Sequence, residues 1–154
     1  MKTLLVFGFI FATFKAHSAS TTANVTSYVV RAINIEKISD LNFGIGIPGD
    51  SSKVVLPGTV ENDENASFKI SGEPGAVFNI SLPMSSGIVI NNGAGGSAQT
   101  EIKITNFKTN VDNTFPKFNE QGQFKLFVGA TRASIRQDQI PGPYVGFFPV
   151  VVVY

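Results

Sequence analysis

Cysteine and tryptophan are absent from this chain, and its only histidine is His17. Without cysteine there is no disulfide and no thiolate nucleophile, and one histidine cannot supply the common zinc sites. His17 also falls in a segment that we expect to be removed, which excludes a histidine-activated serine. None of the 11 acidic residues lies in a pattern that indicates a buried carboxylate pair with shifted pKa values. We therefore expect no enzyme, and we assign no catalytic residue, cofactor or metal ligand.

Charge is also scarce, because Asp, Glu, Lys and Arg make up only 15% of the residues, while 43% are hydrophobic. Such a composition supplies a packed core and argues against wholesale disorder. The chain has no basic excess of the kind that binds nucleic acids or anionic membranes. We expect no nucleic-acid partner.

Residues 1–19 have the pattern of a secretory signal peptide. A basic start at Lys2 precedes an apolar run of 11 residues, Leu4–Phe14, and small residues follow up to Ala19. Spanning a membrane needs about 20 apolar residues, so a membrane anchor is the less favoured alternative. No later run is long enough to span. Without Lys2 and Lys15, ten basic residues face 11 acidic ones, and the mature chain is nearly neutral.

Short runs rich in Val, Ile, Phe and Thr alternate with turn residues along the rest of the chain. Fifteen glycines and eight prolines mark the turns, and no stretch keeps a helical apolar period over three turns. The pattern predicts one all-β domain, an antiparallel sandwich or barrel. The expected strands are Asn24–Arg31, Ile33–Lys37, Lys53–Leu56, Ser67–Ser71, Val77–Leu82, Gly87–Ile90, Thr100–Phe107, Phe124–Ala130 and Tyr144–Tyr154.

Two motifs suggest functions that their surroundings do not favour. Gly44–Gly49 has the G-x-G-x-x-G spacing of dinucleotide sites, but Pro48 leads into another strand-like run instead of the helix that such a site needs. A turn is the favoured interpretation. Residues 61–65, ENDEN, lack the ligand spacing of a calcium loop, so we expect a solvated loop tip.

The C-terminal run, PGPYVGFFPVVVVY, is unlike the other predicted strands. Ser67–Ser71 alternates apolar and polar residues, as expected for a strand with one solvated face, but the final run is apolar on both faces. Tyr144, Phe148, Val150, Val152 and Tyr154 lie on one face, and Val145, Phe147, Val151 and Val153 lie on the other. We expect both faces to be covered. Pro149 lacks an amide donor and interrupts any ladder.

The first residues after the signal peptide also alternate along an extended chain. Ala23, Val25, Ser27 and Val29 share one face, and Asn24, Thr26, Tyr28 and Val30 share the other. No turn signal occurs before residues 39–40. This segment can fold back as a first strand of its own domain, or it can leave the domain and pair with another copy.

Taken together, these blocks resemble a known family. The frame consists of the alternating N-terminal strand followed by INIEKISDLNFG, ASFKISGEPGAVFNISLP, NEQGQFKLFVGATRAS and PGPYVGFFPVVVVY. It covers nearly all of the mature chain and resembles an uncharacterised family of secreted bacterial domains of unknown function. That family is similar in pattern to spore-coat-U-like proteins and to chaperone–usher pilins.

Resemblance to pilins implies an immunoglobulin-like antiparallel β-sandwich that is incomplete because it lacks one strand. The gap is filled first by a periplasmic chaperone and then by the N-terminal strand of the next subunit. Residues 20–31 would be the donor-strand segment, and residues 32–154 the β-sandwich domain. The implied donor residues are Ala23, Val25, Ser27 and Val29, and the implied acceptor groove is lined by Tyr144, Phe148, Val150, Val152 and Tyr154.

Three features depart from the pilin pattern. Many pilins carry a disulfide, which this chain cannot form. Ser27 fills an apolar pocket poorly, and Pro149 interrupts the acceptor ladder. A donor register shifted by one residue, with Tyr28 and Val30 inward, therefore stays open.

The expected function is a structural subunit of a bacterial surface fimbria or filament that polymerises by donor-strand exchange and serves cell adhesion. Its expected partners are copies of itself or related pilins, a periplasmic chaperone and an outer-membrane usher. Its expected location is extracellular, after export through the periplasm. The alternative is a self-complemented monomeric secreted adhesin or coat domain, in which the N-terminal strand completes its own sandwich.

Overall fold

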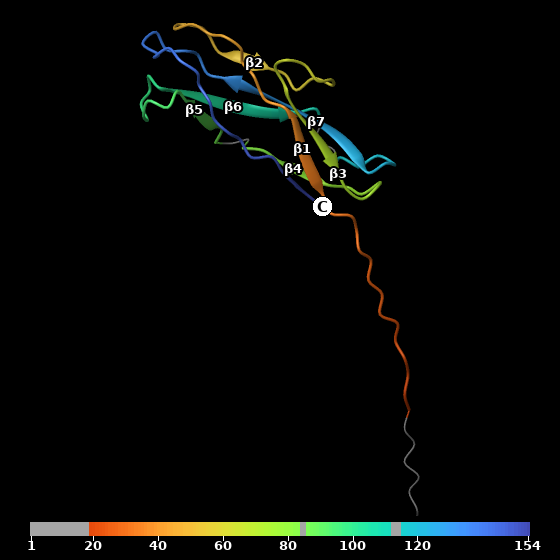
Figure 1. Ribbon diagram of the computed structural model, residues 1–154. Helices are drawn as coiled ribbons and strands as arrows, with labels where there is room; N and C mark the ends of the chain where they lie inside the picture. The colour runs from red at the N-terminus through yellow and green to blue at the C-terminus, as the bar shows by residue number, and fades with distance from the viewer. Residues whose placement is uncertain (1–18, 84–85, 112–114) are drawn as a thin grey trace, which may run out of the picture.

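The computed structural model describes residues 19–83, 86–111 and 115–154 (Figure 1). The expected signal peptide lies outside these residues, except for Ala19. The strands are β1 (Asn34–Ser39), β2 (Lys53–Val55), β3 (Ala66–Ser71), β4 (Asn79–Ser81), β5 (Ile88–Asn91), β6 (Glu101–Thr109), β7 (Gln123–Arg132) and β8 (Val151–Val153). The described ranges contain no helix, and therefore none that is long and apolar enough to cross a membrane.

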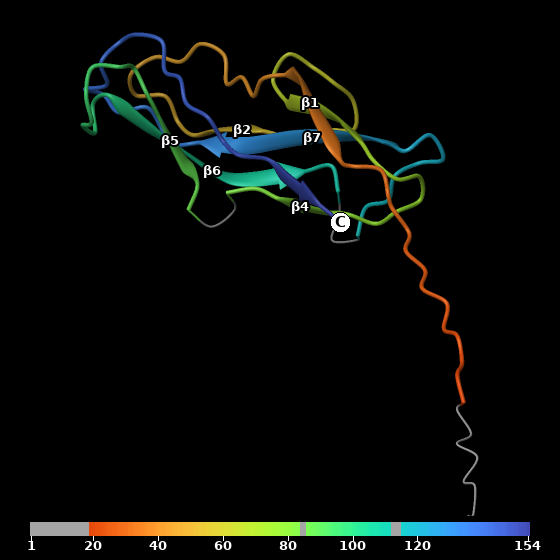
Figure 2. The same cartoon turned by 60° about the horizontal axis from the view of Figure 1, so that its bottom comes forward.

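The strands form one large and one small antiparallel sheet (Figure 2). The large sheet has the order β1-β3-β7-β6-β5, and β2 pairs with the last residues of β7. The small sheet consists of β4 and β8. Side chains from both sheets contribute to a single core. The prediction of an all-β, antiparallel, sandwich-like fold is confirmed.

A bulge in β6 contributes to the curl of the large sheet. The ladder between β6 and β7 shifts register between Thr105 and Lys108. Asn106, within this bulge, has a positive φ of 52°, which asparagine tolerates better than most residues. Because a bulge bends its strand and increases the local twist, the two longest strands curve around the core.

Alternation along the strands determines which side chains form the core. In β3, Phe68 and Ile70 are buried, while Lys69 between them is exposed. Phe78, which precedes β4, is fully buried and meets Phe124 of β7 edge-on, with ring centroids 5.1 Å apart. Aromatic pairs of this kind add about 0.5–1.5 kcal/mol beyond their area burial. They join the two sheets of a chain that has no disulfide.

Two predicted strands differ from the structure. Asn24–Arg31 is extended, but it has no ladder partner in the described chain and therefore forms no sheet. Within Tyr144–Tyr154, only β8 forms a ladder. One local cause is visible in the remainder, because Pro149 has no amide hydrogen to donate to a ladder.

Candidate functional site

The C-terminal segment, residues 144–154, presents one face to the core. The half-buried residues on that face are Tyr144, Phe148, Val150 and Val152. The ring of Phe148 lies 5.1 Å from that of Phe107, measured between centroids. On the opposite face Phe147 is 89% exposed. The expectation that both faces are covered is wrong for the single chain, because the described residues place no second layer over the outer face.

Among the described residues, backbone hydrogen bonds join the same segment to the domain only near its two ends. Near its start, Val145 exchanges two backbone hydrogen bonds with Asn91, at 3.1 and 2.9 Å. Near its finish, β8 pairs with β4. Within the described chain, residues 146–150 make no backbone hydrogen bond to another segment, and β8 has no strand on its other edge. The segment therefore offers unpaired peptide groups, the feature that lets a sheet edge accept another strand.

Strand β1 offers a second unpaired edge, because β3 is its only partner among the described strands. Ile35 of β1 stands opposite Ile70 in that ladder, and residues directly opposite each other lie on the same face of a sheet. Ile35 therefore faces the core, as Ile70 does. Ile70 is fully buried, but Ile35 is 39% exposed. The core is thus open to solvent beside β1.

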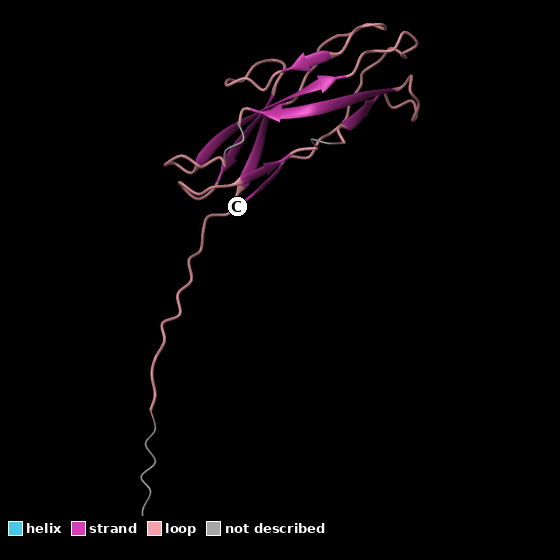
Figure 3. Cartoon of the chain, turned by 180° about the vertical axis from the view of Figure 1, so that it is seen from behind, coloured by secondary structure: helices cyan, strands magenta, loops and turns pink. Residues whose placement is uncertain are grey.

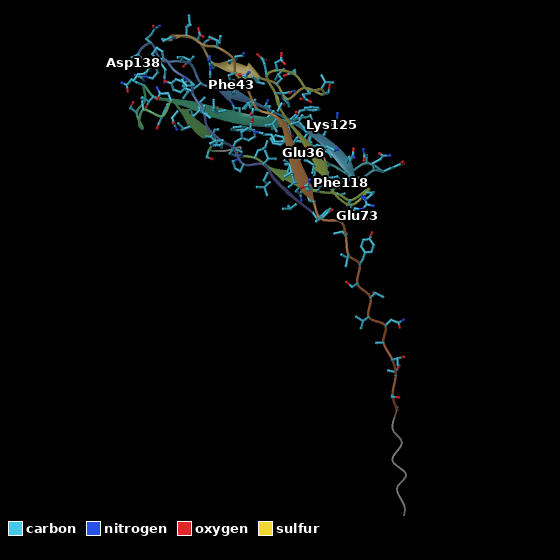
Figure 4. The ribbon with its side chains drawn as sticks, viewed as in Figure 1. Glu36, Phe43, Glu73, Phe118, Lys125 and Asp138 are labelled. Carbon is cyan, nitrogen blue, oxygen red and sulfur yellow. The ribbon has the colours of Figure 1, made fainter. Side chains whose placement is uncertain are left out.

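A groove of about 970 Å³ lies farther along, where Lys37 and Ser39 near the end of β1 contribute to its lining. Residues 37–48 and residues 140–148 form two walls, and the exposed residues Glu61–Asp63 also line the groove. The apolar part of the lining includes Ile88, Ile90, Ile102 and Ile104. Figure 4 shows Phe43, from the first wall, and Asp138, just before the second, at the end of the domain far from Glu73. We call this the distal end and the end at Glu73 the proximal end. Apolar pockets beside unpaired strand edges are typical of a site that accepts an added strand.

The residues predicted for an acceptor groove are only partly brought together here. Tyr144 and Phe148 line the groove. Val150 and Val152 lie farther along the same core-facing side, toward the proximal end. The opposite wall was not predicted, although the apolar alternation in LNFG at 41–44 is a signal that would have indicated it.

Two buried polar side chains also line the groove. Arg132 and Gln139 are only 5% and 6% exposed. The Gln139 amide donates from Nε2 to the carbonyl oxygens of Gln99 and Glu101, at 2.8 and 3.2 Å, and to the Tyr144 hydroxyl at 2.9 Å. Gln139 Oε1 and Arg132 Nε have no hydrogen-bond partner in the described chain. Since buried polar atoms are nearly always paired, these two atoms need an explanation.

The N-terminal segment, residues 19–31, extends away from the domain and leaves it beside the C-terminus (Figures 1 and 3). Every residue of this segment is exposed, and the exposed fractions of Val25 and Val29 are 96% and 86%. Ala23 and Ser27 are exposed as well. The structure therefore does not bring the predicted donor residues to the groove of their own chain.

Glu73 and Tyr154 hold the base of this segment. The Glu73 carboxylate accepts hydrogen bonds from the Tyr28 hydroxyl and from the Arg31 backbone amide, both at 3.0 Å. The Tyr154 hydroxyl donates to the Arg31 carbonyl oxygen and accepts from the Glu73 amide at 2.8 Å. We call Tyr28, Arg31, Glu73 and Tyr154 the base cluster. Tyr154, predicted for the acceptor groove, thus lies at the base of the donor segment.

The base cluster shifts two pKa values. The backbone hydrogen bond from Arg31, followed by the bond from Tyr28, lowers the pKa of Glu73 below its ordinary 4.5. The hydrogen bond to Glu73 raises the pKa of Tyr28 above its ordinary 10.0. Each shift favours the protonation state that makes the contact. Because Tyr28 is engaged by its own chain, the face with Val25 and Val29 is the one that stays available.

The two motifs noted in the sequence form loops. At Gly44–Gly49 the chain makes a turn before β2, in which the Asp50 amide donates to the Ile47 carbonyl at 3.1 Å. Residues 61–65 form a loop, as expected, but Asn65 is fully buried and donates to two backbone carbonyls, so the loop is not solvated throughout. Among the residues described, no three His, Cys, Asp or Glu side chains gather as a metal site.

These features define an all-β, antiparallel, sandwich-like domain with a groove beside its C-terminal segment. Residues 33–154 match a family described as a domain of unknown function, DUF4402, and the chain belongs to this family. The matched range contains all the described strands and both walls of the groove, and it begins after the exposed N-terminal segment. Searches of curated proteins and of solved structures gave no match.

Proposed function

We propose that this protein is a structural subunit of a bacterial surface fimbria or filament, and that copies join by strand donation. Residues 20–31 of one copy would fill the groove of the next. One observation carries the proposal: the described chain contains both an extended segment without a partner strand and a groove lined by residues of the unpaired strand β1 and by residues 146–148, which have no backbone partner among the described residues. A strand added there gains main-chain hydrogen bonds, while alternate side chains enter the groove.

Folding back into the same groove is the less favoured arrangement. It would require a tight reversal between Arg31 and β1, where only Ala32 and Ile33 intervene. Neither is a residue that favours tight turns, which are built mainly from Gly, Asn, Asp, Pro and Ser. The base cluster also directs the chain away from the domain at Arg31. Donation to a neighbour needs no such reversal.

The direction of the donated strand follows from where the segment leaves. The C-terminal segment runs from the distal to the proximal end, and residues 19–31 leave from the proximal end (Figure 1). A donated segment running antiparallel to residues 144–154 would bring the donor's own domain to the acceptor's distal end. Each subunit then stacks head to tail on the next. Such a heterologous contact generates an open filament when the rotation between copies does not close a ring.

Length and burial support the same proposal. At about 3.3 Å per residue, the 12 donor residues span about 40 Å and the 11 residues of the C-terminal segment about 36 Å. Burying the side chains of Val25 and Val29 contributes about 1.5–3 kcal/mol each, before the cost of ordering the segment is deducted. The donor can therefore cover the whole acceptor edge.

We further propose the partners and location that this assembly implies. An exported subunit with an open apolar groove is prone to nonspecific association. A periplasmic chaperone would cover the groove until the next subunit arrives, and an outer-membrane usher would pass the growing filament to the cell surface. The role is structural rather than enzymatic.

The first test removes the donor. The full chain, exported from bacterial cells, should form multimers that resist SDS without boiling. Deletion of Thr21–Val30 should abolish them, because the groove loses its occupant. A matched variant with ten Gly and Ser residues in place of that segment keeps the length and should also fail to assemble.

Two outcomes would contradict this proposal. One is a deletion variant that still forms SDS-resistant multimers. The other is a full chain that stays monomeric while Val25 is protected from solvent at nanomolar concentration, which would support the self-complemented adhesin or coat domain instead.

A further inference from the structure

The groove and the donor face each contain a polar interruption. The buried residues that line the groove are Ile102, Ile104, Ile135, Arg132 and Gln139. Three are apolar, and the two polar ones carry the unpaired atoms Arg132 Nε and Gln139 Oε1. The donor face consists of Ala23, Val25, Ser27 and Val29, and Ser27 is its only polar residue.

We infer that Ser27 of the donated strand is the residue that pairs with Arg132 and Gln139 of the next subunit and fixes the register. Its hydroxyl donates to Gln139 Oε1 and accepts from Arg132 Nε. A serine hydroxyl has one hydrogen to donate and lone pairs to accept with, so one group has the chemistry to pair with both atoms. This inference rests on the proposed function and deepens it, because it names the specificity-determining contact.

The side chains that carry the two unpaired atoms, Arg132 and Gln139 of the accepting subunit, are held in place by other contacts. Two carbonyl acceptors on Nε2 fix the orientation of the Gln139 amide, which leaves Oε1 as its unpaired atom. Arg132 donates from Nη2 to the Ser51 carbonyl at 2.9 Å. The backbone at Gly46 packs over this guanidinium, since a Cβ there would come within 2.5 Å of Nη1. In the proposed contact, the entering strand displaces this cover to reach the two atoms.

The order of polar and apolar residues agrees along the two partners. Gln139 is hydrogen-bonded to Tyr144, at the start of the C-terminal segment and therefore toward the distal end. In the antiparallel arrangement, the donor residues nearest their own domain lie at that end. Ser27 precedes Arg31 by four residues, or about 13 Å. Val25 then falls farther toward the proximal end, where the core-facing residues of the acceptor are apolar.

The experiment compares two substitutions, on opposite faces of the donor, that each replace a hydroxyl by a methyl group; Ser27→Val also adds a second methyl group. SDS-resistant multimers of the full chain, of Ser27→Val and of Thr26→Val are diluted into guanidinium, and their dissociation rates are measured. Ser27→Val should dissociate about tenfold faster, because two buried polar atoms lose their partner. Thr26→Val should stay within about twofold of the parent, and so should Ser27→Thr, which keeps the hydroxyl.

Two results would overturn the inference while leaving the proposed function intact. Ser27→Val multimers that dissociate as slowly as the parent, or more slowly, would show that the pocket is apolar. In an Arg132→Met background, Ser27→Val should accelerate dissociation by less than about threefold, and fully additive effects would deny the contact. If Arg132→Met fails to fold, the dissociation rates of Ser27→Val and Ser27→Thr still test the contact, because Ser27 is exposed in the single chain. A parent chain that forms no multimers would instead remove the proposed function itself.

Discussion

Glu73 connects the N-terminal segment to the domain through two different atoms of its carboxylate. One oxygen accepts from the Tyr28 side chain and the other from the Arg31 backbone. Its own amide donates to Tyr154, whose hydroxyl also contacts Arg31. Four residues from three distant parts of the sequence therefore determine where the extended segment begins and in which direction it leaves.

We expect the base cluster to open in acid. Because the folded chain lowers the pKa of Glu73, the stabilisation is present above the ordinary value of 4.5 and is lost as pH falls through the lowered value. The NMR shift of the Arg31 amide proton should titrate with a midpoint below 4.5. Glu73→Gln should abolish that titration, whereas Glu36→Gln should leave it unchanged. A midpoint at or above 4.5 would speak against this contact.

At the scale of elements, the strands that could be predicted were those in which apolar and polar residues alternate along the sequence. Ser67–Ser71 and Thr100–Phe107 agree with β3 and β6 to within two residues at each end, because one buried and one solvated face leave a period of two in the sequence. The C-terminal run was harder, because all its residues are apolar and the pattern cannot show which face meets the core. Alternation also does not reveal whether a strand has a partner, as residues 24–31 demonstrate.

The candidate site could be predicted only on one side for a similar reason. Tyr144 and Phe148 belong to a run whose composition drew attention. The opposite wall and the unpaired atoms of Arg132 and Gln139 depend on contacts between distant segments. The alternation in LNFG could have indicated a buried face at residues 41–44, but local sequence patterns do not record which distant segments meet.

The donor segment should tolerate charge on only one face. Val25→Asp would bury a carboxylate in an apolar groove, a change that costs several kcal/mol unless the charge is paired. We expect it to reduce SDS-resistant multimers by more than about a hundredfold. Asn24→Asp adds the same charge on the other face and should assemble almost normally. Loss of multimers in Asn24→Asp with nearly normal assembly of Val25→Asp would indicate the alternative register with Tyr28 and Val30 inward.

At the scale of the whole molecule, head-to-tail donation has a polarity that a symmetric dimer lacks. The groove lies toward the distal end, and the donor leaves the proximal end (Figures 1 and 4). In the proposed filament, each added subunit would therefore present one new groove or one new donor, and growth would stop only when an end is capped.

A free peptide of residues 20–31 should act as such a cap. It can occupy a groove but brings no domain to continue the chain. With increasing peptide, multimers of the full chain should become shorter on an unboiled SDS gel. The same peptide with Val25→Asp serves as the control and should have little effect. Multimers whose length is independent of the wild-type peptide would contradict assembly through this groove.

The direct connection from the exposed segment into β1 has a mechanical consequence. Tension along such a filament would pass from Arg31 into β1, which five Cα pairs join to β3. Hydrogen bonds between antiparallel strands are perpendicular to the strands, so a pull along β1 loads them together in shear rather than one after another. A subunit built in this way would resist stretching through a shared ladder, and it would do so without a covalent cross-link.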